Sequence, residues 1–224
     1  MNKALIFDAS SLISLAMNGL FDELRSLKRV FNGKFLITKD VFNESIAKPL
    51  TIKRFELEAI RLNQLVEDKT LEFSNVDESQ IQTETKKILE LSNSMYKSKD
   101  EFVKMIDLGE ASCLALSKIL TTQKVPNLIV IDERTTRMLC ESPNQLKKLL
   151  ERKLHIRVNL QKDNSSYFKE FKIIRSCELI YVAFRKNLTL LKGKQSLDAL
   201  LWALRFKGCS ISDEEIKEIK LLKL

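Results

Sequence analysis

Two short apolar segments of the chain end on an aspartate, and a helix-like segment follows each. Residues 4–7 run into Asp8, and residues 128–131 run into Asp132. In an open parallel sheet, ligands bind outside the carboxyl ends of the strands, so two neighbouring strands of this kind would bring both carboxylates into one small volume. A strand-final Asp taken alone is more simply a helix N-cap. The two together predict a site.

Two further acids are candidates for the same place. Glu44 follows an expected second strand by a few residues, and Glu110 follows Gly109 at the start of an apolar helix. Crowded carboxylates repel one another, so they either take up protons or are neutralised by a cation. Oxygen ligands favour Mg²⁺ or Mn²⁺. Such an ion can hold a phosphate oxygen, activate water and stabilise a leaving oxygen, so the predicted chemistry is phosphodiester hydrolysis.

Other catalytic chemistries find little support in the composition. The chain has a single histidine, His155, which excludes a two-histidine metal site and leaves one candidate for a Ser-His-Asp triad. His155 lies in an apolar segment with no serine motif beside it, so we interpret it as structural. The four cysteines are widely spaced, and we interpret them as small buried apolar residues. Their positions are Cys113, Cys140, Cys177 and Cys209.

Strand and helix patterns alternate along the first two thirds of the chain. Continuously apolar segments predict parallel strands that are covered on both faces. This alternation predicts an α/β fold with a mainly parallel sheet. From about residue 169 onward the pattern is purely helical. The expected strands are 3–8, 34–38, 70–76, 127–132 and 154–160; the expected helices are 10–19, 40–50, 55–68, 78–97, 107–120, 133–142, 175–187, 196–209 and 212–222.

The charge is unevenly distributed along the chain. The formal net charge is +8, and residues 145–224 carry 18 Lys and Arg against 9 Asp and Glu, whereas residues 1–144 are almost neutral. A basic region beside a balanced one suits a polyanionic partner such as nucleic acid. The alternative interpretation is a set of lysine-rich helix faces that only contact solvent.

The sequence also predicts where the protein works. No apolar run approaches the length of a membrane span, and the N-terminus lacks the order of basic, apolar and small residues of a signal peptide. We therefore expect a cytoplasmic protein that does not contact membranes.

Four stretches, in order, give the chain a family resemblance. They are IFDASSLI (6–13), VFNES (41–45), LGEASCLALS (108–117) and LIVIDERTTR (128–137). In type and spacing they resemble the PIN-domain nucleases, which include VapC-type toxins and RNA-processing enzymes. The resemblance covers about residues 3–160. We expect a PIN-like nuclease domain over 1–160 and a basic helical C-terminal extension over 161–224.

The resemblance implies a PIN-like three-layer sandwich and specific roles for the acids. Asp8, Glu44, Glu110 and Asp132 would be the catalytic residues. Asp8, Glu110 and Asp132 would hold Mg²⁺ or Mn²⁺, and Asp107, one helical turn before Glu110, is the alternative third ligand. The expected substrate contacts are Ser10, Arg134 and Arg137.

The activity that the resemblance implies is that of a divalent-metal-dependent endoribonuclease acting on RNA. Homodimers are frequent in the family, and an antitoxin or another protein is a further expected partner. A long insert over 50–104 and the helical tail depart from compact toxins, so a toxin and an RNA-processing role both stay open. The main alternative is a catalytically inactive module that binds RNA or protein. A DNA structure-specific nuclease is a weaker one, because glycine motifs of helix-hairpin-helix type are absent.

Overall fold

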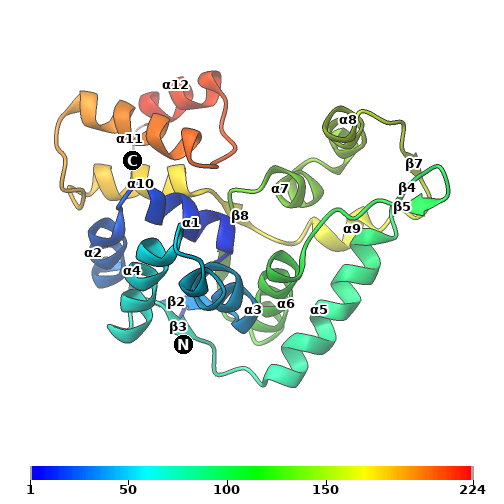
Figure 1. Ribbon diagram of the computed structural model, residues 1–224, viewed down its shortest axis with the longest axis horizontal. Helices are drawn as coiled ribbons and strands as arrows, with labels where there is room; N and C mark the ends of the chain where they lie inside the picture. Colours follow the sequence, from blue (N-terminus) through cyan, green and yellow to red (C-terminus); the bar gives the residue numbers. More distant parts are fainter. Residues whose placement is uncertain (1, 223–224) are drawn as a thin grey trace.

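The computed structural model describes residues 2–222, and a parallel β-sheet forms its centre (Figure 1). In these residues the sheet has five strands in the order β3-β2-β1-β6-β8, and each adjacent pair is parallel. From β1 the chain adds β2 and β3 on one side and β6 and β8 on the other. The switch point of the sheet therefore lies between the carboxyl ends of β1 and β6. The strands are β1 (Ala4–Phe7), β2 (Lys34–Ile37), β3 (Glu72–Phe73), β6 (Asn127–Val130) and β8 (Ile173–Ile174).

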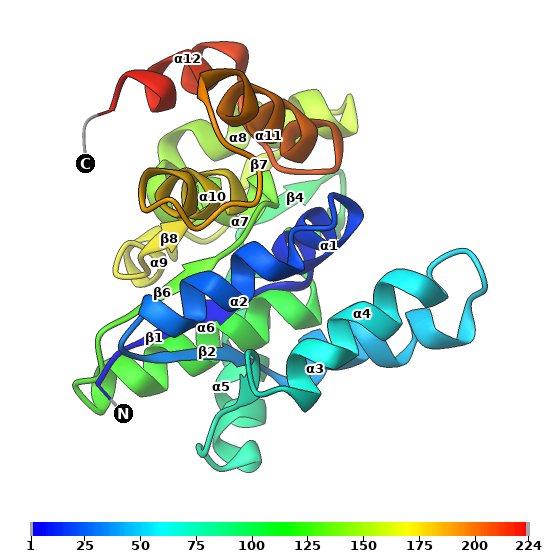
Figure 2. The ribbon, with the colours of Figure 1, turned by 90° about the vertical axis from the view of Figure 1, so that its left-hand side faces the viewer.

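Helices cover both faces of this sheet. Figure 2 shows α1 and α2 on one side and α5 and α6 on the other. The predicted α/β class and the mainly parallel sheet are thus confirmed. The helices are α1 (Ala9–Met17), α2 (Phe21–Val30), α3 (Lys39–Phe42), the π-helical η1 (Asn43–Ala47), the 3₁₀ turn η2 (Pro49–Thr51), α4 (Glu56–Glu67), α5 (Glu78–Asn93), α6 (Leu108–Thr122), α7 (Arg134–Glu141), α8 (Pro143–Leu154), α9 (Ser165–Phe168), α10 (Ser176–Arg185), α11 (Lys194–Phe206) and α12 (Asp213–Leu221).

The core explains why the apolar segments form strands and why one helix is buried on all sides over most of its length. Every residue of β1 is buried, and so are Phe35, Leu36 and Ile37 of β2. Residues 109–117 of α6 are buried without interruption, because α6 packs between α5 and strands β1 and β6. A helix without a polar face is the expected result of such a central position.

The C-terminal part of the chain differs from its prediction at one point. Ile173 and Ile174 form β8, which pairs with β6 in the order Ile129 to Ile173 and Val130 to Ile174. The expectation that the chain is purely helical from residue 169 is therefore wrong. A two-residue strand is too short to show an alternating pattern, and it forms because β6 offers a free parallel edge.

The expected strand 154–160 also differs. Leu154 ends α8, His155 has a left-handed backbone (φ 55°) that stops the helix, and Asn159–Leu160 form a short strand, β7. β7 pairs antiparallel with β4 (Tyr96–Ser98), which also pairs with β5 (Glu101–Phe102), in a second small sheet. The apolar alternation that suggested a long strand belongs largely to exposed side chains, since only Val158 of this alternation is buried.

The last three helices form a layer over α1 and α2. α10 contacts both of these helices, α11 packs on α10, and α12 packs on α11, as Figure 1 shows in yellow, orange and red. The carboxylate of Glu23 on α2, which is buried, accepts a hydrogen bond from the backbone N–H of Leu190 (2.9 Å) and so ties the α10–α11 loop to α2. Over residues 2–222, no helix is both long enough and apolar enough to cross a membrane.

Candidate active site

Asp8 lies at the carboxyl end of β1, where the sheet changes direction, and it caps α1. Its Oδ2 accepts hydrogen bonds from the Ser10 backbone N–H (2.9 Å) and from the Ser10 hydroxyl (2.5 Å). The residue is 2% exposed, and among the described residues Oδ1 finds no hydrogen-bond partner. Burial raises the pKa of Asp8, the Ser10 hydrogen bonds oppose that rise, and the charge of Asp132 adds a little to it. Oδ1 of this carboxyl is thus out of contact with solvent and accepts no hydrogen bond from the described part of the chain.

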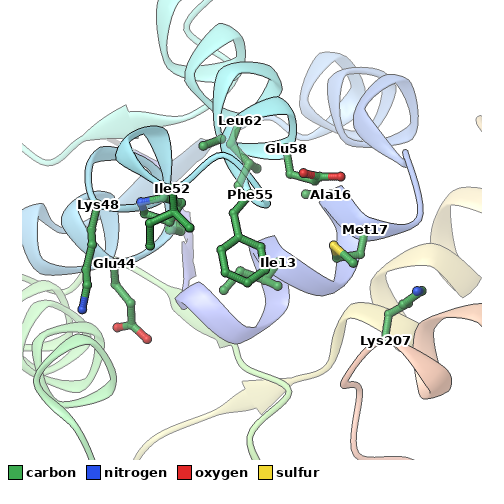
Figure 3. Close-up of a pocket in the computed structure, with 13 residues that line it drawn as sticks. Ile13, Ala16, Met17, Glu44, Lys48, Ile52, Phe55, Glu58, Leu62 and Lys207 are labelled. Carbon is green, nitrogen blue, oxygen red and sulfur yellow. The ribbon is translucent and has the colours of Figure 1, made fainter.

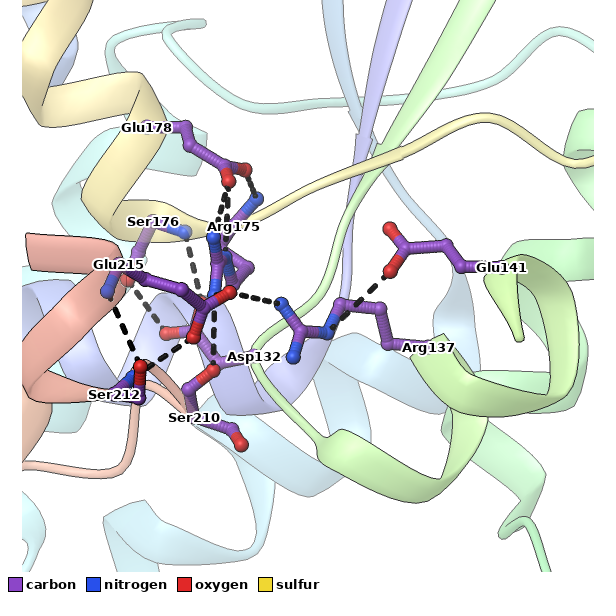
Figure 4. Close-up of polar contacts among 9 residues, drawn as sticks. All are labelled: Asp132, Arg137, Glu141, Arg175, Ser176, Glu178, Ser210, Ser212 and Glu215. Carbon is purple, nitrogen blue, oxygen red and sulfur yellow. Dashed lines mark hydrogen bonds and ion pairs between the residues drawn. The ribbon is translucent and has the colours of Figure 1, made fainter. Parts of the chain in front are cut away.

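Asp132 follows β6 at the same edge of the sheet, and Ser10 links it to Asp8. The Ser10 hydroxyl accepts a hydrogen bond from the Asp132 backbone N–H (3.0 Å) while it donates to Asp8. The carboxylate of Asp132, however, is directed to α10. Its Oδ1 accepts from the Ser176 backbone N–H (2.8 Å) and its Oδ2 from the Ser176 hydroxyl (2.6 Å), as Figure 4 shows. The fully buried Asp132 therefore anchors the first turn of α10.

Glu110 lies in the first turn of α6 and is 9% exposed. Its Oε2 accepts a hydrogen bond from the Asp107 backbone N–H (2.7 Å), which closes the N-terminus of the helix. Burial, followed by the negative charges of Asp8 and then Glu133, raises the pKa of Glu110 to about 8, and the hydrogen bond from Asp107 opposes this. Glu110 therefore shares the electrostatic environment of Asp8.

Asp107, the alternative third ligand, occupies a different position. Its carboxylate is largely exposed and forms an ion pair with Lys104. Its charge acts on Glu44, whose pKa it helps to raise. Asp107 thus lies on the solvent side of these carboxyl groups, whereas Glu110 lies on their buried side.

Glu44 lies in the π-helical turn η1 and extends toward the N-terminus of α6. A π-helical turn is rare and often occurs at functional sites. The Oε2 atom of Glu44 lies so close to Gly109 that a Cβ there would be 2.5 Å from it. Partial loss of solvent, then the charges of Asp8 and Asp107, raise the pKa of Glu44, and Lys48 opposes the rise. An exposed side chain is thus held against the N-terminus of α6.

Together these side chains form what we call the acidic group: Asp8, Glu44 and Glu110, with Asp107 and Glu133 at its rim. Sequence reasoning missed Glu133, although it directly follows Asp132. Glu133 caps α7, accepting a hydrogen bond from the Thr136 backbone N–H (2.8 Å), and its other oxygen accepts one from the Lys153 Nζ (3.2 Å). α8, to which Lys153 belongs, therefore ends beside the acidic group.

The acidic group has two features that suit a divalent cation. The buried Oδ1 of Asp8, which no residue in 2–222 partners, fits one. The pKa values of Asp8, Glu44 and Glu110 also fit one, because burial raises all three and the charge of Asp8 further raises those of Glu44 and Glu110. In residues 2–222, no three acidic, histidine or cysteine side chains are already arranged to hold a metal ion.

The two arginines predicted to contact substrate lie in different surroundings. Arg134 is exposed at the first residue of α7. Arg137 is buried, and its guanidinium lies near the carboxylates of Glu141 (3.8 Å) and Glu215 (3.9 Å). Glu215 comes from α12, so Arg137 contacts the C-terminal helices.

An ion-pair network centred on the buried Arg175 lies beside the contact between Asp132 and Ser176 (Figure 4). The guanidinium of Arg175 pairs with Glu178 (2.6 Å) and with Glu215 (2.7 Å), and it donates to the Ser210 carbonyl (3.2 Å). Sequence reasoning also missed this network. Its one visible signal was the spacing of Ser212 and Glu215, a capping box that the structure confirms.

Comparison of the chain with protein-family models, with curated proteins and with solved structures gave no match. The functional argument therefore depends on the geometry of the acidic group and its surroundings.

Proposed function

We propose that the protein is a PIN-like, divalent-metal-dependent endoribonuclease that hydrolyses RNA phosphodiester bonds at the acidic group. The observation that carries this proposal is the carboxyl of Asp8, which is buried at the switch point of the sheet with one oxygen unpaired. The parallel five-stranded sheet between helical layers, with acids at its carboxyl edge, supports a PIN-like interpretation of the fold.

Mg²⁺ or Mn²⁺ would be held by Asp8 and Glu110, with Glu44 as the third carboxylate. When bound, such an ion holds a phosphate oxygen, lowers the pKa of water and stabilises the leaving oxygen. Asp132 enters the proposal as a positioning residue, because both of its oxygens already accept hydrogen bonds from Ser176. It holds the strand end, and through its N–H it orients the Ser10 hydroxyl toward Asp8.

The side chains of the group also handle protons. Ser10 keeps the Oδ2 of Asp8 in a fixed direction, and the buried Oδ1 has no hydrogen-bond partner among residues 2–222, so it is the oxygen that a bound cation would contact. Glu44 is the most solvent-accessible member of the catalytic three, so its carboxylate is placed to accept the proton of an attacking water. Glu110, with a pKa near neutrality, can hold a proton when no cation balances the group.

RNA is the proposed substrate because a basic helix adjoins the acidic group. α8 carries four exposed basic side chains, and its Lys153 reaches Glu133. Phosphates of a polyanion bound along α8 would lead to the acidic group. The basic residues of α8 are Lys147, Lys148, Arg152 and Lys153.

The test is EDTA-sensitive cleavage of single-stranded RNA in the presence of Mn²⁺ or Mg²⁺. Asp8→Asn should abolish cleavage while the protein stays folded by circular dichroism. Asp77→Asn is the matched control, because Asp77 also caps a helix by accepting from a serine N–H two residues later (Ser79, 2.8 Å), far from the acidic group in sequence. Equal cleavage by wild type and Asp8→Asn would refute the proposal.

The second candidate is an RNA- or protein-binding module without catalysis. The observation that favours it is the use of Asp132 as a structural anchor, which leaves one fewer free carboxylate at the site. RNA binding without cleavage, over several RNAs and both metals, would support this candidate.

A further inference from the structure

An apolar cavity of about 450 Å³ opens directly beside the acidic group (Figure 3). It lies between α1, α4 and the η1–η2 segment. Ile13 and Met17, one helical turn apart on α1, form one wall, and Ile52 and Phe55 form the facing wall. All four side chains are partly exposed. Apolar side chains that line a concave surface and stay accessible to solvent mark a binding site more often than scattered ones do.

Charged groups surround this apolar surface. Figure 3 shows Lys48 beside Glu44 at one end of the cavity and Lys207 beyond Met17 at the other end. A further cation, the guanidinium of Arg54, lies 5.4 Å from the centre of the Phe55 ring. The cavity thus combines apolar walls with a lysine at each end and two carboxylates, those of Glu44 and Glu58.

Glu44 connects the cavity to the acidic group. It lines the cavity, while its carboxylate lies against Gly109 in the first turn of α6, the turn that carries Glu110. A ligand that fills the cavity would therefore have its polar end next to the proposed cleavage site.

The segment that carries Lys207 is held in place by α1. The Ser14 hydroxyl donates to the Lys207 carbonyl (3.3 Å). Gly208 follows with a φ of 120°, and a Cβ there would lie 3.4 Å from the Ser14 hydroxyl oxygen. The segment between α11 and α12 thus brings the exposed Lys207 to the edge of the cavity, with its backbone held by α1.

We propose that this cavity binds one unstacked nucleobase of single-stranded RNA, next to the phosphodiester that the acidic group would cut. The inference rests on the proposed function and extends it to substrate recognition. A nucleobase is flat and uncharged, and in RNA a phosphate lies on either side of its nucleoside. The cavity offers apolar walls and the Phe55 ring to the base, and a lysine at each end to the two phosphates. Single-stranded nucleic acid is commonly recognised by bases that stack on aromatic side chains within a basic surround.

Glu58 gives the cavity a preference among bases. Its side chain, which is partly exposed, lines the cavity from α4 (Figure 3). A carboxylate accepts hydrogen bonds from the exocyclic amino group of a base. Adenine, cytosine and guanine carry that group and uracil does not, so we expect uracil to bind least well.

The experiment measures binding, so it does not depend on cleavage. Short RNAs that carry the fluorescent base 2-aminopurine at one position are titrated with metal-free protein, and matched RNAs carry an abasic site there. Phe55→Ala should weaken binding of the 2-aminopurine RNA about tenfold (about 1.4 kcal/mol), because the base loses the ring on which it stacks. On the abasic RNA the same substitution should have no effect. Phe73→Ala is the matched control, because Phe73 and Phe55 are both 40% exposed and Phe73 does not line this cavity.

Three outcomes would overturn the inference. Phe55→Ala could leave binding of the 2-aminopurine RNA unchanged, it could weaken binding of both RNAs equally, or wild-type protein could bind both RNAs alike. The last result would favour an apolar side chain of a protein partner as the occupant. Base-dependent binding in a wild type that cuts no RNA with either metal would refute the proposed nuclease and retain the base-binding cavity.

Discussion

At the scale of single residues, the acidic group places carboxyl groups where folding has removed their solvent. Asp8 and Glu110 are buried, and the negative charge of Asp8 raises the pKa of both Glu110 and Glu44. Burial favours the neutral form of each carboxyl more than water does, so all three pKa values lie above their ordinary values. The site therefore lowers the stability of the metal-free protein at neutral and alkaline pH.

Glu110 gives this effect a measurable pH dependence. Its pKa is about 8 in the folded protein against 4.5 as the ordinary value. Because the folded-state pKa is the higher one, the stabilisation from Glu110 is complete below about pH 4.5 and is lost as the pH rises through 8. We expect metal-free protein to lose about 2–4 kcal/mol of unfolding free energy between pH 5 and pH 9, since each pKa unit corresponds to about 1.4 kcal/mol.

Urea unfolding over this pH range measures the loss. Glu110→Gln should remove most of it, whereas Glu101→Gln, at an exposed acid on the small second sheet, should keep the wild-type profile. Mn²⁺ should restore stability to the wild type mainly at the alkaline end. A pH profile shared by wild type and Glu110→Gln would show that Glu110 is not the group responsible.

Ser10 is the second residue with a defined expectation. Its hydroxyl joins Asp8 to the Asp132 backbone, so Ser10→Ala removes a buried hydrogen bond from each. We expect a loss of about 1–3 kcal/mol in unfolding free energy and a further rise in the pKa of Asp8. Thermal unfolding gives the first quantity, and the pH dependence of stability gives the second. Ser196→Ala, in the first turn of α11, removes only an exposed hydrogen bond to the Lys192 carbonyl, so it should change the unfolding free energy much less and leave the pKa of Asp8 unchanged.

The sequence predicts those site residues whose positions depend on local features, and it misses contacts between distant segments. Asp8 and Glu110 could be found because a strand end and a helix start are local features, and these place both side chains at one edge. The partner of Asp132 could not be found, since Ser176 is 44 positions away and belongs to a tail that was assigned to a separate extension. The burial of Arg137 depends on Glu215 of the last helix in the same way.

At the scale of elements, the meeting of η1 and α6 positions Glu44. Gly109 leaves the space that the Glu44 carboxylate occupies, and only the end of a flexible side chain stands in the way of a Cβ. Gly109→Ala should therefore fold normally and gain up to about 1 kcal/mol from helix propensity. RNA cleavage should nevertheless fall, because the carboxylate is displaced.

A double-mutant cycle tests this expectation. Glu44→Gln and Gly109→Ala should each lower cleavage, and the double variant should be no slower than Glu44→Gln alone. Fully additive losses would mean that Gly109 acts by a route other than Glu44.

The contact between Asp132 and α10 gives the second prediction for an element. Ser176→Ala leaves Asp132 Oδ2 buried with one hydrogen bond fewer. We expect a loss of about 1–3 kcal/mol in unfolding free energy, with faster amide hydrogen exchange in the first turn of α10. Exchange in α5, on the other side of the sheet, should not change. Unaltered protection of α10 would show that this bond does not hold the helix.

Elements were predicted best where their pattern was long and local. The strands that end at Asp8 and Asp132 and the helix after Gly109 appear where the sequence placed them. The prediction missed α2 and α8, and it extended the helix at 78–97 past Asn93, where the chain turns into the second sheet. β8 and β7 exist because partner strands are present, and no local pattern reveals a partner.

At the scale of the whole molecule, the charges of α8 give a prediction for RNA affinity. Each neutralised phosphate of a single strand contributes a slope of about −0.7 to the dependence of log affinity on log salt. The double variant Lys147→Gln, Lys148→Gln should reduce that slope by about 1, whereas Lys186→Gln, Lys217→Gln, with the same change of net charge on the C-terminal helices, should leave it close to wild type. Equal slopes for the two double variants would remove α8 from the RNA-binding surface.

The pairing of β8 with β6 has a consequence for biosynthesis. A polypeptide leaves the ribosome from its N-terminus, so β1, β2 and β6 emerge well before Ile173 and Ser176. Until then the last strand of the sheet is missing and the Asp132 carboxylate has no helix to hold. Nascent chains arrested before about residue 180 should consequently be sensitive to protease along β6, and the acidic group should be among the last parts of the protein to mature during translation.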